Sequence, residues 1–134
     1  MSNNRDQWNN LLTDLSERQA MAEALGGKER VDRQHDKGRL TARERLELLF
    51  DADSFREIGA LAGGNHPAGG AALAGDGVVG GTGKVHGRSV VAMAEDFTVK
   101  GGSIGQVNSA KRTRLVRLAL DQKLPGVIMV VGGG

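Results

Sequence analysis

The chain has 134 residues, of which 39% are hydrophobic, 3% aromatic and 25% charged, a composition that fits one aliphatic globular domain. Its net charge of +2 is too small to indicate the basic surface that nucleic-acid binding requires, and the absence of cysteine excludes disulfides and thiolate metal sites. No apolar run reaches the ~18 residues of a membrane span and no secretory signal begins the chain, so a soluble cytoplasmic protein is expected.

One long helix is expected at the start of the chain. Apolar side chains recur on one face from about residue 5 to residue 25, and the pair Gly26-Gly27 ends this helix. The stretch that follows, residues 28–39, is rich in charge and contains one histidine. No regular element is assigned to it.

A second helix follows that charged stretch. Thr41 and Glu44 have the spacing of a capping box, in which the side chain of each residue bonds the backbone N–H of the other. The helix that they open carries several leucines and ends near residues 51–54. Residues 1–54 are therefore assigned to an N-terminal helical segment.

The middle of the chain is expected to contain β-structure. Residues 55–61 form a short predicted strand, and the Gly- and Ala-rich stretch 62–75 is interpreted as a mobile loop. Residues 77–85 and 88–94 are then typical of the two strands of a hairpin. The His-Gly pair at 86–87 provides its turn.

A helix and a strand are expected after the hairpin. Ser103, at the end of the loop 96–102, can cap a helix over about 104–120. Pro125 ends that region, and 126–131 is an apolar run suited to a buried strand. Such a strand needs neighbours and a following helix, so we interpret the sequence as cut inside a β-α-β unit.

The glycines at 80–84 do not form a nucleotide-binding motif. A P-loop needs a glycine five positions before its Gly-Lys pair and a Ser or Thr after it, but Val78 and Val85 occupy those positions. The dinucleotide fingerprint also fails, because His86 stands where its third glycine belongs. Neither class of nucleotide-binding protein is therefore favoured.

Three other features are candidate parts of a binding site. Gly101, Gly102 and Ser103 precede a helix, where exposed N–H groups can hold an anion, although a plain turn is the better explanation on local grounds. Lys111 lies within the apolar stripe of that helix, where it either snorkels from the edge of the core or points a cation into a cleft. The glycines at 132–134 either turn their N–H groups toward a ligand or form a flexible end.

Four blocks of the sequence, in this order, resemble the carboxyltransferase β-type subunits of biotin-dependent acyl-CoA carboxylases, a branch of the crotonase-like superfamily. The first block is HDKGRLTARERL at 35–46, and the second is GDGVVGGTG at 75–83. The third is DFTVKGGSIG at 96–105, and the fourth is PGVIMVVGGG at 125–134. Lys111 also stands where that family usually has a lysine.

The resemblance implies an α/β fold in which N-terminal helices precede the start of a crotonase-like β-β-α spiral domain, incomplete here, at residues 55–134. It implies transfer of a carboxyl group from carboxybiotin to the α-carbon of a short-chain acyl-CoA, without a metal. Biotin would be carried by a biotin carboxyl carrier or biotin carboxylase subunit, and a homo-oligomer, by resemblance a hexamer, is expected. The second crotonase-like half, which supplies the biotin side, is absent from the sequence, so these residues alone are expected to be inactive.

The resemblance also assigns site residues. Gly133 and Gly134 fall on the pair that forms the acyl-CoA oxyanion hole, although Val131-Gly132 replaces the Asp-Ser pair that the family has before it. The residues assigned to the CoA side are Gly101, Gly102, Ser103 and Lys111. Two alternatives stay open: a non-catalytic truncated paralogue or assembly fragment that binds carboxylase subunits, and a generic anion-binding domain.

Overall fold

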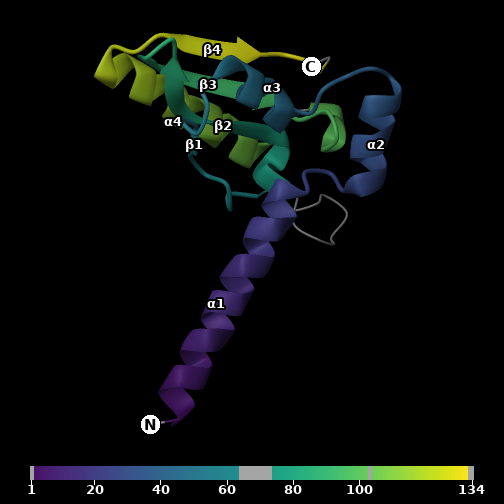
Figure 1. Cartoon of the computed structure of the whole chain (residues 1–134), viewed down its shortest axis with the longest axis vertical. Coiled ribbons are helices and arrows are strands. Elements are labelled where there is room, and N and C mark those ends of the chain that lie inside the picture. The colour runs from purple at the N-terminus through teal and green to yellow at the C-terminus, as the bar shows by residue number, and fades with distance from the viewer. Residues whose placement is uncertain (1, 64–73, 103, 133–134) are drawn as a thin grey trace.

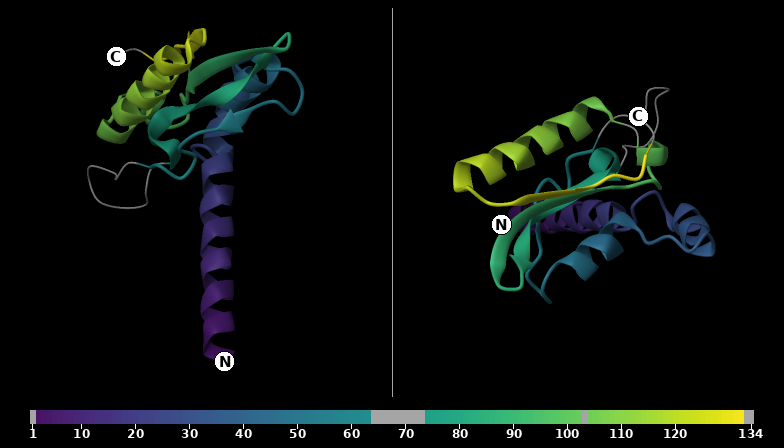
Figure 2. Two further views of the ribbon diagram at one scale, coloured as in Figure 1. Left: turned by 90° about the vertical axis from the view of Figure 1, so that its left-hand side faces the viewer. Right: turned by 90° about the horizontal axis from the view of Figure 1, so that it is seen from above.

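The computed structural model describes residues 2–63, 74–102 and 104–132, and it shows a four-stranded mixed sheet with helices on both faces (Figure 1, Figure 2). The strand order β1-β2-β3-β4 follows the chain; the first two pairings are antiparallel and the third is parallel. The strands are β1 (Arg56–Glu57), β2 (Val78–Val85), β3 (Arg88–Glu95) and β4 (Gly126–Met129). The helices are α1 (Ser2–Glu23), α2 (Lys28–Asp36), α3 (Ala42–Leu49) and α4 (Gln106–Gln122), with short 3-10 turns η1 (Ala74–Gly77) and η2 (Lys100–Gly102). None of the described helices has both the length and the hydrophobicity of a membrane span.

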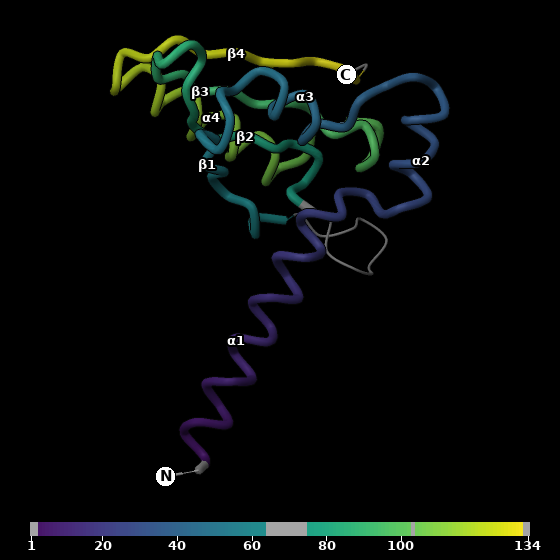
Figure 3. Tube along the Cα trace, viewed as in Figure 1, coloured from purple at the N-terminus to yellow at the C-terminus, as the bar shows by residue number. Residues whose placement is uncertain are grey.

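Helix α1 projects away from the sheet, as the Cα trace in Figure 3 shows. Its apolar side chains are largely exposed, Trp8 at 63% and Leu11 at 61% of their surface. The helix meets the rest of the molecule at its C-terminal end, where Ala22 and the following Leu25 are buried. The helix predicted over about 5–25 is thus confirmed.

Helix α2 occupies the charged stretch to which the sequence analysis assigned no element. Hydrophobic periodicity could not predict this helix, because charged side chains dominate it. Opposite charges instead pair one turn apart, Lys28 with Asp32 and Glu29 with Arg33. Such pairs each stabilise a helix by about 0.2–0.5 kcal/mol.

Helix α3 begins with the predicted capping box. The backbone N–H of Glu44 donates to Thr41 Oγ1 at 3.2 Å, and the N–H of Thr41 donates to Glu44 Oε2 at 2.7 Å. Two N–H groups that the first helical turn leaves without helical partners are thereby satisfied. The helix presents Leu46, which is fully buried, to the sheet.

The predicted hairpin is confirmed, since β2 and β3 pair along their whole length. His86 and Gly87 have φ values of 49° and 78°, the positive values that a type I′ turn requires. The Asp51 carboxylate accepts both of their N–H groups, at 3.0 and 2.8 Å, and so ties the turn to the end of α3. The strand predicted at 55–61 is shorter than expected, with only two residues in β1.

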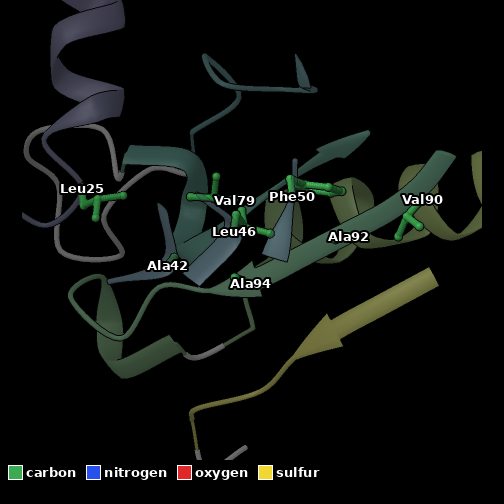
Figure 4. Close-up of a cluster of buried hydrophobic side chains, with 8 residues drawn as sticks. All are labelled: Leu25, Ala42, Leu46, Phe50, Val79, Val90, Ala92 and Ala94. Carbon is green, nitrogen blue, oxygen red and sulfur yellow. The ribbon is translucent and has the colours of Figure 1, made fainter. Parts of the chain in front are cut away.

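The sheet separates two apolar clusters. The cluster toward α3, drawn in Figure 4, consists of Leu25, Ala42, Leu46, Phe50, Val79, Val90, Ala92 and Ala94. The cluster toward α4 consists of Val78, Val91, Met93 and Leu115. Alternate residues of β2 and β3 therefore enter opposite cores, as the two-residue period of a strand dictates.

Glycines in β2 allow helices to approach both faces of the sheet. A Cβ at Gly80 would lie 2.5 Å from Leu115 Cδ1 of α4, and a Cβ at Gly83 would lie 2.5 Å from Phe50 Cδ1. Neither position has room for a side chain unless its neighbours move. The glycines that failed to match a nucleotide-binding motif are therefore packing positions.

Strands β3 and β4 lie parallel and are connected through α4 as a β-α-β unit. The N-cap of α4 is Gly105, so the helix begins later than predicted, and Ser103 lies outside the described residues. β4 was expected to be buried, but it is an edge of the described sheet and Ile128 is 50% exposed. Most of the loop predicted at 62–75 also lies outside the described residues.

Candidate functional site

The two glycine segments singled out in the sequence meet in space. A Cβ at Gly132 would lie 2.7 Å from the carbonyl oxygen of Gly101, and a Cβ at Gly102 would lie 3.7 Å from Gly132 Cα. The chain leaving β4 therefore contacts the η2 turn directly, and only a glycine at 132 permits this approach. Gly133 and Gly134, the predicted oxyanion-hole pair, lie outside the described residues.

The η2 turn has an unusual backbone conformation. Lys100, Gly101 and Gly102 all have positive φ, at 49°, 62° and 76°. This region is unfavourable for a residue with a Cβ, so Lys100 needs support from its surroundings. Its Nζ donates to Asp76 Oδ1 at 2.8 Å, which links η2 to the η1 turn.

Glu95, at the carboxyl end of β3, holds the chain at Val131 and Gly132. Its Oε2 accepts the backbone N–H groups of Val131 at 2.8 Å and Gly132 at 2.9 Å, and its Oε1 accepts from Arg112 at 2.8 Å. Burial by itself would raise the pKa of Glu95, but the two N–H groups and the Arg112 guanidinium outweigh it and hold the pKa below 4.5. An ionised carboxylate thus fixes this backbone next to η2.

The same hydrogen-bond network continues along α4. Arg112 Nε donates to Asn108 Oδ1 at 2.6 Å, while the backbone N–H of Asn108 donates to Asp76 Oδ2 at 2.7 Å. Asn108 Nδ2 also donates to the carbonyl of Asp76 at 2.8 Å. Asp76 therefore caps the first turn of α4 from a distant part of the chain, the role that the sequence analysis gave to Ser103.

Lys111 points into the molecule. Its Nζ donates to the carbonyls of Gly75 at 3.0 Å and Val78 at 2.7 Å, and the residue is 7% exposed. Burial lowers the pKa of its ammonium group. Of the two orientations considered for this side chain, the structure shows the ammonium joining η1 and β2, and its predicted contact with CoA stays a prediction.

A cavity of ≈ 400 Å³ opens beside Val131, the residue before Gly132. Its lining comes from three sequence blocks and includes Thr41, Arg45, Asp96, Phe97 and Val131. Asp96 is 2% exposed, and its Oδ2 has no hydrogen-bond partner among the described residues. Burial raises the pKa of this carboxyl group, against the opposing effect of its hydrogen bonds to Thr98.

The sequence analysis missed the side chains that organise the site. Glu95, Asp76, Asn108 and Arg112 do not belong to a catalytic motif, and they lie far apart in the chain. Two signals were available: the Glu-Asp pair directly after an apolar strand, and the one-turn spacing of Asn108 and Arg112. Neither signal indicates which distant residue each of these side chains contacts in the folded protein.

Comparison with known proteins shows which chains are similar to this one. Residues 33–134 match the carboxyl transferase domain family. The chain is 43% identical over 123 residues to methylmalonyl-CoA decarboxylase subunit alpha of Veillonella parvula, covering 90% of this chain and 24% of that protein. It is 39% identical over 129 residues to the propionyl-CoA carboxylase beta chain of Cereibacter sphaeroides, covering 92% of this chain and 25% of that protein.

Solved structures give the same result. The transcarboxylase 12S structure with methylmalonyl-coenzyme A and methylmalonic acid bound superposes with a TM-score of 0.87 at 39% identity, covering 94% of this chain and 25% of that one. A single-chain, multi-domain long-chain acyl-CoA carboxylase superposes with a TM-score of 0.82 at 33% identity, covering 92% of this chain and 14% of that one. The chain spans about a quarter of the length of the curated relatives it matches.

Proposed function

This chain belongs to the carboxyl transferase domain family, and from that membership we propose that it forms the acyl-CoA-binding part of a carboxyltransferase. The reaction is transfer of a carboxyl group from carboxybiotin to the α-carbon of a short-chain acyl-CoA. Relatives named propionyl-CoA carboxylase and methylmalonyl-CoA carboxyltransferase support this substrate class. The alternative of a non-catalytic fragment is not favoured by these relatives.

The observation that carries the proposal is the contact between η2 and Gly132, with Glu95 holding the N–H groups of Val131 and Gly132. Glu95 occupies those two donors, and the proposal assigns the contact with the ligand to the backbone N–H groups of the next two residues in the sequence, Gly133 and Gly134. In the proposed mechanism these donors stabilise the thioester oxygen of the enolate. In the net reaction the carboxyl group of carboxybiotin replaces one hydrogen on the α-carbon, and that proton ends on the ureido nitrogen of biotin that carried the carboxyl group. Gly101 and Gly102 form the adjoining wall.

Biotin belongs to a partner in this proposal, as a biotin carboxyl carrier or biotin carboxylase subunit. A relative is named as a biotin-dependent acetyl-/propionyl-coenzyme A carboxylase beta5 subunit. When bound, carboxybiotin supplies the carboxyl group, and we assign none of the described residues to it. Assembly into a homo-oligomer belongs to the same proposal, supported by the hexamer assembly described for transcarboxylase 12S.

The test is acyl-CoA-dependent consumption of carboxybiotin by the full-length protein, with propionyl-CoA and acetyl-CoA compared. We expect Gly134→Val to lower kcat by about 10²–10³-fold, the usual effect of losing one oxyanion donor, with thermal stability unchanged. Gly126→Val is the control for adding the same side chain at a glycine, because Gly126 lies outside the site, has no positive φ and has room for a Cβ. A protein that consumes no carboxybiotin with either acyl-CoA contradicts the proposal.

A further inference from the structure

Thr98 connects the segment before η2 to the junction between α1 and α2, which consists of Gly26 and Gly27. Its hydroxyl oxygen accepts the backbone N–H of Gly26 at 2.9 Å, and its carbonyl oxygen accepts from Arg30 Nη1 at 3.2 Å. These bonds join residues 72 and 68 positions apart in the sequence, so only the fold brings them together. The N-terminal helices are therefore bonded directly to the segment that leads into η2.

Asp96 fixes the orientation of the Thr98 hydroxyl. Asp96 Oδ1 accepts the backbone N–H of Thr98 at 2.9 Å and its Oγ1–H at 2.5 Å. A hydroxyl has a single hydrogen, so with this hydrogen on Asp96 the Oγ1 atom can only accept from Gly26. Asp96 is 2% and Thr98 4% exposed, so the bonds between them lie in the protein interior. The hydroxyl is thus both donor and acceptor in one defined arrangement.

The approach of Gly26 to Thr98 requires a glycine at this position. A Cβ at Gly26 would lie 2.1 Å from the carbonyl oxygen of Thr98, a backbone atom that cannot rotate away as a side chain could. Gly26 has no positive φ, so the requirement is steric. The sequence analysis gave Gly26 only the role of ending a helix, and this contact gives it a second one.

The position of Thr98 bears on the proposed acyl-CoA site because η2 begins two residues later. Gly102 in that turn donates its N–H to the carbonyl of Val99 at 2.9 Å, and the carbonyl oxygen of Gly101 lies against Gly132. A displacement of Thr98 would therefore be passed on to the contact between η2 and Gly132.

We propose that Thr98 is a positioning residue for carboxyl transfer, which holds η2 against the backbone at Gly132 through its hydroxyl bonds to Gly26 and Asp96. This inference rests on the proposed function, which places the acyl-CoA thioester beside these segments. Thr98 contacts neither the substrate nor the reacting atoms in this proposal and acts through the backbone of η2. The junction between α1 and α2 thereby supports a site whose glycines lie far from it in the sequence.

The first test compares Thr98→Val with Thr98→Ser in the full-length protein. Valine keeps the branched shape but cannot accept the N–H of Gly26, whereas serine keeps the hydroxyl. We expect Thr98→Val to lower kcat for carboxylation of propionyl-CoA by about tenfold and to change KM by less than about twofold, because the turn is misplaced without loss of a substrate contact. Thr98→Ser should recover most of kcat. Thr113→Val, at an exposed position on α4, is the matched control and should keep wild-type kcat.

This comparison separates positioning from a purely structural role. Each variant is assayed below its own melting transition, so that all of the protein is folded. A folded Thr98→Val protein with wild-type kcat overturns the inference, and so does a Thr98→Ser protein whose kcat is as low as that of Thr98→Val.

The second test uses wild-type protein and requires no activity. If the bond to Thr98 holds η2, the amides of Gly26 and Gly102 should open together and show equal protection from hydrogen exchange within about threefold, measured by mass spectrometry of peptides fragmented to single residues. Protection of Gly26 far below that of Gly102 would show that η2 stays closed while the bond is open, and would overturn the inference. Absence of carboxyl transfer by wild type, together with equal protection of the two amides, contradicts the proposed function and leaves the link between Gly26 and η2 supported.

Discussion

Two buried carboxylates, Glu95 and Asp76, hold nearby backbone and side-chain donors in place. Glu95 satisfies two N–H groups at the end of β4 and one guanidinium from α4. Asp76 similarly accepts from Asn108 and Lys100. These two buried carboxylates are therefore surrounded by donors, as the cost of burying a charge requires. Removing one of them leaves several donors unpaired.

The first prediction concerns Glu95. Glu95→Ala leaves the N–H groups of Val131 and Gly132 and the Arg112 guanidinium without this acceptor, at a cost of about 1–3 kcal/mol for each buried group. We expect a lower melting temperature and a kcat for carboxyl transfer reduced at least tenfold. Glu95→Gln keeps an acceptor oxygen for the two N–H groups and should recover most of kcat. Wild-type kcat in a folded Glu95→Ala protein would show that the hydrogen bonds of Glu95 do not shape the site.

Lys111 allows its two possible roles to be separated. Lys111→Met removes the hydrogen bonds to the carbonyls of Gly75 and Val78, so we expect the free energy of unfolding to fall by about 1–3 kcal/mol. A KM for acyl-CoA that matches wild type at low and at high salt would assign the ammonium to these carbonyls alone. A KM that rises at low salt only would instead support the predicted electrostatic contact with CoA.

Asp96 should give the fold an unusual pH dependence. Burial raises the pKa of Asp96 in the folded protein above the ordinary value of 3.8. Between pH 3.8 and this raised pKa, the folded protein therefore binds more protons than the unfolded one. The contribution of Asp96 to stability therefore falls as pH rises through this window. Melting temperatures measured from pH 4 upward should show Asp96→Asn gaining on wild type until the window is passed. A difference between the two proteins that is constant with pH contradicts the prediction.

At the scale of elements, glycine spacing controls how helices approach the sheet. Gly80 faces α4 and Gly83 faces Phe50, so one strand serves both layers. The two faces of β2 consequently pack against different parts of the chain. A single added methyl group on either face affects the packing of one helix and not the other.

This leads to a prediction for a matched pair of glycines. A Cβ at Gly80 would lie 2.5 Å from Leu115 Cδ1, whereas at Gly126 the nearest atom is 3.9 Å away, and neither glycine has a positive φ. We expect Gly80→Ala to destabilise the protein by about 1–3 kcal/mol through overpacking. Gly126→Ala should change stability by less than about 0.5 kcal/mol. Equal unfolding midpoints in chemical denaturation would show that α4 moves freely to accept the methyl group.

Local chemistry explains which elements the sequence could predict. The capping box at Thr41 and the hairpin turn at His86 depend on neighbouring residues, and both were predicted correctly. Helix α2 was missed because its apolar side chains are few and its stabilising pairs are charged. The cap of α4 was also missed, because Asp76 reaches it across the fold. Side chains that meet only in three dimensions leave little trace in a single sequence.

At the scale of the whole molecule, distant blocks of sequence converge on one cavity. The cavity beside Val131 is lined by Thr41 from the first block of the resemblance, by Asp96 and Phe97 from the third and by Val131 from the fourth. By resemblance, the sequence analysis assigned residues of the third and fourth blocks to one acyl-CoA site, but it assigned no site residue to the first block. The contribution of α2 and the Glu95 network required the structure.

A polypeptide of these 134 residues alone is expected to transfer no carboxyl group. The residues span about a quarter of the curated relatives, and we assign none of the described residues to biotin. Carboxybiotin and propionyl-CoA would be mixed with this polypeptide, with the full-length protein as positive control. Product formation above the buffer background would contradict the prediction.

The hydrogen bonds of Glu95 also bear on the order in which the molecule folds. The β2–β3 hairpin closes over a two-residue turn, so little chain entropy opposes its formation. The bonds from Glu95 to Val131 and Gly132 close loops of 36 and 37 residues and require α4 to be in place. We therefore expect the contact between η2 and Gly132 to form after the hairpin and to open while the hairpin stays intact. Access to this contact would then depend on local opening, which Glu95 opposes through its hydrogen bonds to Val131 and Gly132.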